Sequence, residues 1–305
     1  MLVWEEGNLL KSQVFFICML GIILALFTAF FESIKDVLSK KNVKNIDEYV
    51  VAFSLMFFAL PFVTPILFWI GIPVVENQFW KALVISGTLN VLAIILYMKA
   101  LKASDLSITI PMVAFTPLFL LVASPLIVGE FPNSVGLMGV LLIVFGSYTL
   151  NIKQRKNGFL SPFKSLLREK GPRLMLGVAI LYSITASYDK VGVQASSPLF
   201  WIVIKSLFMV LLLIPFVLSK RKQRIKQICF NWKLLLLVGF FMALVMIFHM
   251  TAISLTLVTY VIAIKRTSVI MSVLWGAIIF KEKGIKERLV GAVIMVLGVV
   301  LIVLS

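Results

Sequence analysis

The chain alternates long apolar stretches with short polar ones. Asp, Glu, Lys and Arg are all absent between Tyr49 and Val75 and between Leu234 and Ile264. A helix needs about 20 apolar residues to cross the hydrocarbon core of a bilayer, and the residue-by-residue alternation of a transmembrane β-barrel is missing. The second run is too long for one span and is expected to turn near Ser254 to Leu257. The pattern predicts an all-α integral membrane protein with ten transmembrane helices, at 13–34, 48–70, 79–101, 106–128, 134–152, 173–192, 197–219, 233–254, 257–280 and 286–304.

The second half of the chain repeats the first. At offsets of 152 or 150 residues, matching pairs include Glu130 with Glu282, Gly139 with Gly291, Gly146 with Gly298, Lys40 with Lys190 and Pro65 with Pro215. The paired glycines predict faces of close helix packing. Five helices per copy is an odd number, so the second copy enters the membrane with opposite polarity. Such inverted repeats are typical of secondary transporters.

These boundaries divide the chain into an N-terminal tail (1–13), a first five-helix repeat (14–151), a basic linker (152–171) and a second five-helix repeat (172–304).

Composition and charge agree with a membrane protein. The chain is 61% hydrophobic and 14% charged, whereas soluble domains are about 25% charged. Lys and Arg outnumber Asp and Glu by 29 to 13. In a membrane protein this excess indicates cytoplasmic loops rather than nucleic-acid binding. The basic residues concentrate in 153–173, in 220–233 and in the other loops on the same side. We therefore expect a multi-pass protein of the cell membrane with these loops in the cytoplasm and both termini outside.

Several stretches resemble the EamA-type transporters of the drug/metabolite transporter superfamily. The likeness lies in "SIKDVLSKK" (33–41) and its echo "SITASYDKVGV" (183–193), in "YMKALKASDLSITIPMVAFTPLFLLVASPLIVGE" (97–130), and in the glycine-rich ends of both repeats. The resemblance implies a ten-helix carrier that works by alternating access. Many members export amino acids or other small metabolites, and some move nucleotide sugars or phosphorylated compounds. Many are thought to keep both termini in the cytoplasm, unlike the orientation expected here.

Charged side chains at membrane depth cost at least about 2.5 kcal/mol and normally face a cavity or a partner. Lys265 and Arg266 stand near the middle of segment 257–280, and Lys205 lies a third of the way into 197–219. One hypothesis is an anion-binding site, because Arg can donate two parallel hydrogen bonds to a carboxylate or phosphate and Lys adds a point charge. The alternatives are structural pairs with buried acids, or snorkelling of Lys205 to the interface.

A second group of candidates could gate the pathway or bind a coupling ion. Glu32 and Asp36 share a face near the end of the first segment, and Asp189 with Lys190 occupies the comparable place in the second repeat. His249 is the single histidine and could relay protons. The alternative is a solvated helix end with ordinary ion pairs for the acids and a packing role for the histidine.

Other candidates could shape the cavity. Asn90, Tyr260 and Trp275 could line it, with the aromatic rings stacking on a substrate. Pro111 and Pro117 break the hydrogen-bond ladder of segment 106–128 and could form a hinge. The second repeat places Ala263 and Val269 opposite them, so it lacks the proline pair.

Enzyme chemistry finds no support in the sequence. It contains no HExxH, GxSxG, P-loop or GxGxxG motif, and we expect no cofactor, no metal site and no enzymatic activity. The prediction is a secondary-active transporter of a small organic metabolite, such as an amino acid or organic acid, with an anionic group favoured. Two alternatives are a lipid-linked substrate translocase and a non-transporting membrane receptor or assembly subunit. The expected partners are the substrate and membrane lipid, and monomer and homodimer both stay open.

Overall fold

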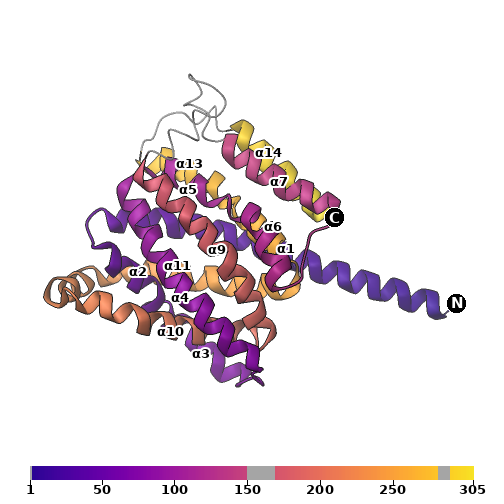
Figure 1. Cartoon of the computed structure of the whole chain (residues 1–305), viewed down its shortest axis with the longest axis horizontal. Helices are drawn as coiled ribbons and strands as arrows, with labels where there is room; N and C mark the ends of the chain where they lie inside the picture. The colour runs from indigo at the N-terminus through magenta and orange to yellow at the C-terminus, as the bar shows by residue number, and fades with distance from the viewer. Residues whose placement is uncertain (1, 150–168, 281–288) are drawn as a thin grey trace.

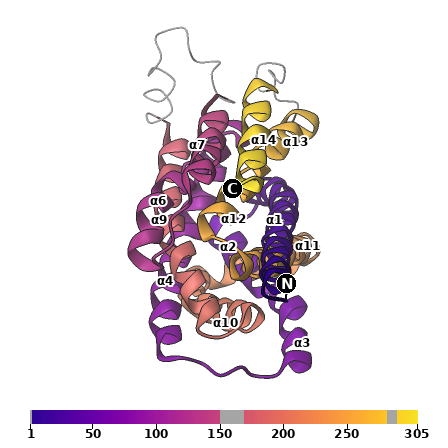
Figure 2. The same ribbon diagram turned by 90° about the vertical axis from the view of Figure 1, so that its right-hand side faces the viewer.

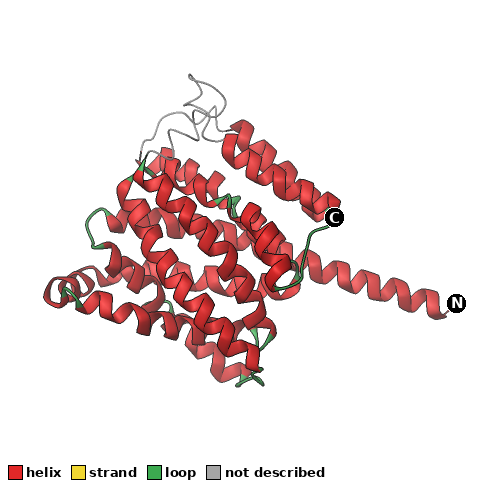
Figure 3. Cartoon of the chain, viewed as in Figure 1, coloured by secondary structure: helices red, strands yellow, loops and turns green. Residues whose placement is uncertain are grey.

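The computed structural model describes residues 2–149, 169–280 and 289–305, and within these ranges every regular element is a helix (Figures 1 and 3). The first repeat holds α1 (Leu2–Val43), α2 (Glu48–Phe57), α3 (Leu60–Ile70), α4 (Asn77–Ala103), α5 (Leu106–Val113), α6 (Thr116–Ile127) and α7 (Ser134–Thr149). The second holds α9 (Lys170–Gln194), α10 (Pro198–Leu218), α11 (Arg221–Leu255), α12 (Val258–Lys265), α13 (Ser268–Phe280) and α14 (Leu289–Val303). Most of the basic linker lies outside the described residues.

The apolar pattern located six of the predicted membrane segments at helices of the required length. Within the described ranges, six helices are long and apolar enough to cross a bilayer, among them Phe16–Val43, Glu48–Phe68 and Arg221–Leu255. The chain is therefore a multi-pass membrane protein. The turn expected near Ser254 to Leu257 is confirmed, because α11 ends at Leu255 and α12 begins at Val258. One difference concerns α1, which starts at Leu2, so the segment expected as a tail continues the helix and projects from the bundle (Figure 1).

The fourth segment of each repeat is a broken helix. In the first repeat, α5 ends at Val113 and α6 starts at Thr116; in the second, α13 starts at Ser268, the equivalent position at the offset of 152. Only the first break has a proline at its start, Pro117. Each break is closed by a threonine hydroxyl that donates to a carbonyl three residues back, with Thr116 at 2.5 Å and Thr267 at 2.7 Å. The interruption therefore does not depend on proline.

The main helix contacts join one repeat to the other. α4 lies along α9, α1 along α11 and α7 along α14, while α2 contacts α10 (Figures 1 and 2). The first long helix of each repeat thus packs on the third long helix of the other, as a two-fold axis between inverted copies requires. At the contact of α7 with α14, a Cβ atom added to Gly139 would lie 2.6 Å from the carbonyl oxygen of Gly298. Both helices need glycine to approach this closely.

A buried lysine closes the end of the third helix in each repeat. The ammonium of each lysine bonds two backbone carbonyls that the helix end leaves without intrahelical partners, where a positive charge also complements the helix dipole. The pairs are Lys40 with Leu101 O (2.5 Å) and Ser104 O (2.6 Å), and Lys190 with Ile253 O (2.6 Å) and Thr256 O (2.8 Å). This equivalence gives a structural reason for finding lysine at both positions.

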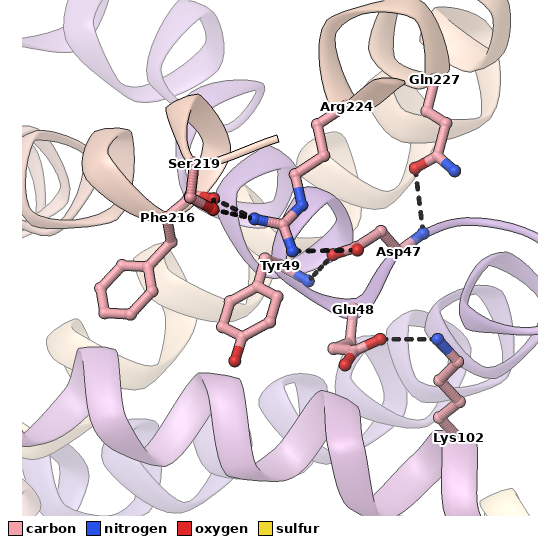
Figure 4. Close-up of polar contacts among 8 residues, drawn as sticks. All are labelled: Asp47, Glu48, Tyr49, Lys102, Phe216, Ser219, Arg224 and Gln227. Carbon is pink, nitrogen blue, oxygen red and sulfur yellow. Dashed lines mark hydrogen bonds and ion pairs between the residues drawn. The ribbon is translucent and has the colours of Figure 1, made fainter. Parts of the chain in front are cut away.

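Asp47, at the start of α2, is tied to Arg224, in the first turn of α11 (Figure 4). One carboxylate oxygen of Asp47 accepts from the Tyr49 amide at 2.9 Å and so caps α2; the other accepts from Arg224 Nη2 at 3.0 Å. Arg224 Nη1 also donates to Ser219 Oγ at 2.7 Å and to the Phe216 carbonyl. The first turns of α11 are thereby fixed against α2 and α10.

Candidate binding cavity

A cavity lies between the two repeats. The empty space in it, counted together with the open solvent at its mouth, is about 770 Å³. Residues of α1, α2 and α4 from the first repeat and of α9 to α12 from the second line it. Seven residues singled out from the sequence are among them, namely Lys265, Arg266, Lys205, Asn90, Glu32, Asp189 and His249. Helices distant in sequence therefore bring the predicted charges to one place.

One end of the cavity carries a chain of charges that begins on α1. Lys35 and Asp36 follow Glu32 by three and four residues, so both neighbour it on the helix surface. Lys35 Nζ lies 2.8 Å from Glu32 Oε1 and 3.1 Å from Asp36 Oδ1, and Tyr97 OH donates to Asp36 Oδ1 at 2.6 Å. Lys265 Nζ stands 3.6 Å from Glu32 Oε2, beyond the range of a direct hydrogen bond. Lys265 is thus held more loosely than Lys35.

A second cluster forms around Asp189 of α9. Its Oδ1 atom accepts from Lys205 Nζ at 2.5 Å, from Ser86 Oγ at 2.6 Å and from Trp201 Nε1 at 3.2 Å. Asn90 extends the cluster by donating to Ser86 Oγ at 3.3 Å. The close contact between the ammonium and the carboxylate neutralises Lys205 within the protein.

Arg266 sits at the break between α12 and α13 and reaches the matching break of the first repeat. Its Nη2 donates to Thr116 Oγ1 at 3.1 Å, and its guanidinium carbon lies 5.8 Å from the centre of the Tyr182 ring. Arg266 is only 2% exposed. Because the broken segments meet here, an arginine at the end of one short helix is placed beside a threonine at the start of another.

Three polar atoms of cavity-lining residues have no hydrogen-bond partner among the described residues: Glu32 Oε2, Arg266 Nε and His249 Nδ1. Buried polar atoms in native proteins are nearly all hydrogen-bonded, to protein or to water, and exceptions often mark functional sites. The hydrogen-bonding capacity of these atoms is therefore not used by the described part of the protein.

The described lining residues have an excess of positive charge. Lys35, Lys205, Lys265 and Arg266 face two lining carboxylates, Glu32 and Asp189, so the formal charge is +2. Asp36, behind Lys35, reduces the sum to +1 when it is included. The cations with the least direct neutralisation are Lys265 and Arg266, and the arrangement can bind an anionic group.

Several predicted residues lie outside the lining. Lys190 pairs with Glu130 Oε1 at 3.1 Å as well as closing α11, Tyr260 OH contacts Ser305 Oγ at 3.1 Å, and Trp275 Nε1 donates to Ser33 Oγ at 3.3 Å. Asp36 lies behind Lys35, and Pro117 marks the start of α6. The side chain of Pro111, within α5, is outside the described ones. Gating and hinge roles for these residues stay predictions.

Sequence reasoning missed two kinds of lining residue. Lys35 and Tyr182 line the cavity, although neither is among the candidate site residues named from the sequence. The methionines Met242, Met246 and Met250 also line the cavity. Their spacing of four residues is a recognisable signal of one helix face, but in such an apolar chain it does not distinguish a cavity from lipid or core.

Comparison with known protein families identifies the family of this chain. Residues 19–152 and 170–304 each match the model of the EamA-like transporter family. The chain belongs to this family. The two matches cover nearly all of both repeats, so this EamA-like protein is a transporter of the drug/metabolite type, built from two copies of one unit. The resemblance drawn from the sequence motifs is confirmed.

The fold of this EamA-like transporter also has a counterpart among solved structures. A crystal structure of another protein matches 95% of this chain and 96% of its own length, with a TM-score of 0.67 and 12% sequence identity. At that identity the likeness concerns the fold alone. No curated protein matches the chain.

Proposed function

We propose that this EamA-like transporter carries a small organic metabolite, such as an organic acid or an amino acid, through the cavity by alternating access and binds it by an anionic group. The observation that carries the proposal is the excess of cationic groups in a cavity between inverted repeats, with Lys265 and Arg266 incompletely neutralised. Arg presents a planar fork that fits the two oxygens of a carboxylate or phosphate, and Lys adds a mobile charge.

Binding in this scheme exchanges partners. The anion replaces Glu32 as the partner of Lys265, because the 3.6 Å between Lys265 Nζ and Glu32 Oε2 is longer than a direct hydrogen bond. The anion also satisfies Arg266 Nε, which lacks a partner among the described residues. Glu32 and His249 then carry unpaired polar atoms beside the substrate. An ammonium group of the substrate or a coupling proton would bind to these two residues.

Transport in this scheme is a rocking of one repeat against the other about a fixed site. Ten spans are proposed, with α2 and α3, α5 and α6, and α12 and α13 each forming one span. The two central breaks meet at Thr116 and Arg266 and would act as hinges. The basic loops would lie in the cytoplasm of the cell and both termini outside, as the excess of Lys and Arg in those loops favours.

The proposal is tested by thermal unfolding of the purified protein with carboxylates, phosphates, amino acids and organic cations, in the parent and in Arg266→Gln. An anion at 100 times its dissociation constant is expected to add about 2.7 kcal/mol to the free energy of unfolding. The effect should vanish in Arg266→Gln and persist in Arg221→Gln, where an exposed arginine outside the lining is changed. Stabilisation by cations, or by anions equally in all three proteins, would contradict the anion site.

Transport itself is measured by uptake of the stabilising anion into liposomes. Uptake that Arg266→Gln abolishes supports a carrier. Binding without uptake would favour a non-transporting membrane receptor instead.

A further inference from the structure

Methionines form one side of the cavity. Met56 of α2, Met209 of α10, and Met242, Met246 and Met250 of α11 all line it; these are five of the 13 methionines in the chain. The three on α11 recur every four residues and so occupy one face of the helix. We call these five residues the methionine wall.

The methionine wall is apolar, and other apolar residues line the cavity with it, while His249 is the polar lining residue on α11. Val245 on α11 and Ile202 on α10 also line the cavity. Ser206 on α10 directs its hydroxyl at Met246 Sδ at 3.6 Å, so this hydroxyl already has a sulfur partner. Lys205 on α10 is charged, and the other charged lining residues come from α1, α9 and the end of α12.

The cavity therefore offers two different surfaces to one occupant. A strongly hydrated molecule would lose water from its hydroxyl groups against thioethers that return only weak hydrogen bonds, which is unfavourable. An apolar group would gain from burial there, and unbranched methionine side chains adapt to irregular shapes.

We infer that the substrate is an amphiphilic anion, with its carboxylate or phosphate on Lys265 and Arg266 and an aliphatic or aromatic body on the methionine wall. This inference rests on the proposed function and narrows its substrate class. The charged end is selected strictly, because only an anionic group would pair with Lys265 and Arg266, and Arg266 is held in place by Thr116. The body is selected loosely, because the thioethers can rearrange, so bodies of similar size and different shape are accepted.

The test is a chain-length series measured by calorimetry on the protein in lipid nanodiscs, with the heats of empty nanodiscs subtracted. The probes are acetate, butyrate and hexanoate, with hexylammonium as the cationic control. Affinity is expected to rise roughly tenfold for every two methylenes buried. Hexylammonium is expected not to bind, and Arg266→Gln is expected to lose all three carboxylates.

Variants of the methionine wall test whether it causes the rise in affinity with chain length. Met242 is half-buried, so its replacement disturbs the core least. Met242→Gln is expected to reduce the hexanoate-to-acetate affinity ratio at least fivefold, whereas Met242→Leu, which keeps an apolar side chain of similar volume, is expected to retain it.

The outcomes separate the two proposals. Equal affinity for acetate and hexanoate, with both lost in Arg266→Gln, would overturn the amphiphilic substrate and leave the anion transporter intact. A chain-length effect that Met242→Gln leaves unchanged would overturn the methionine wall as its origin. Binding that is indifferent to Arg266→Gln, or absent for every anion, would overturn the proposed function itself.

Discussion

The pair formed by Lys205 and Asp189 makes a quantitative prediction about which cation binds substrate. Replacing Lys205 with methionine removes the ammonium 2.5 Å from Asp189 Oδ1 and leaves a carboxylate whose side chain is only 6% exposed. Ser86 and Trp201 continue to donate to it, but neither carries a charge. The variant therefore buries an uncompensated negative charge.

The expected cost follows from that burial. Removing one partner of a buried ion pair typically lowers the free energy of unfolding by about 3 to 5 kcal/mol, whereas replacing both with neutral groups is often nearly neutral. We expect Lys205→Met alone to lie in that range, which is more than a hundredfold in the folding equilibrium. Adding Asp189→Asn should recover most of the loss, because the amide keeps an oxygen for Ser86 and Trp201.

The assay is unfolding by denaturant in detergent micelles for the parent, the two single variants and the double variant, followed by anion binding to the double variant. A coupling energy of at least about 2 kcal/mol is expected between the two sites. Anion binding should survive in the double variant, because Lys265 and Arg266 are intact. A Lys205→Met variant as stable as the parent, or a double variant that no longer binds the anion, would refute the assignment of Lys205 to a structural pair.

Three further predictions concern other parts of the molecule. Glu130→Gln removes the charge 3.1 Å from Lys190 but keeps an acceptor for the amide that begins α12, so we expect a loss of only about 1 kcal/mol in thermal unfolding, and a loss above about 3 kcal/mol would contradict this. Gly139→Ala places a Cβ atom 2.6 Å from a facing carbonyl oxygen, whereas Gly177→Ala meets nothing within 4 Å. The first should destabilise by about 1 to 3 kcal/mol and the second be neutral or slightly stabilising; equal effects would argue against the close helix contact. Cys229 is exposed beside the basic residues of α11, so after serine replaces the other cysteine, an impermeant maleimide should label inside-out vesicles but not intact cells. The reverse labelling would invert the proposed orientation.

Much of the architecture could be predicted because a bilayer constrains sequence strongly. An apolar run of known length identifies a span, and a charge within it, such as Arg266, has few places to lie other than a cavity or a partner. The internal duplication also predicted which residues occupy equivalent positions in the two repeats. The break near Arg266 was harder to predict, because it has no proline and depends on Thr267 and on contact with α6.

The assignment of individual partners required the structure. Lys205 and Asp189 are 16 residues apart on different helices, and periodicity does not indicate that they meet. Tyr260 and Trp275 were expected in the cavity, but in the structure they contact Ser305 and Ser33. An aromatic ring with one polar atom suits a cavity, a helix contact or an interface equally well, so its sequence position alone does not select among them.

The contact between α7 and α14 has a consequence for how such a protein could arise. A Cβ atom on Gly139 would meet the carbonyl of Gly298, one on Gly298 would meet the carbonyl of Gly139, and one on Gly146 would meet the carbonyl of Gly291. These partners run antiparallel, and the duplication makes Gly139 equivalent to Gly291 and Gly146 to Gly298. The helix thus recognises an inverted copy of itself, which is the geometry of a two-fold homodimer. Separately expressed halves of this chain should therefore find each other in the membrane, as two half-length subunits inserted in opposite directions would.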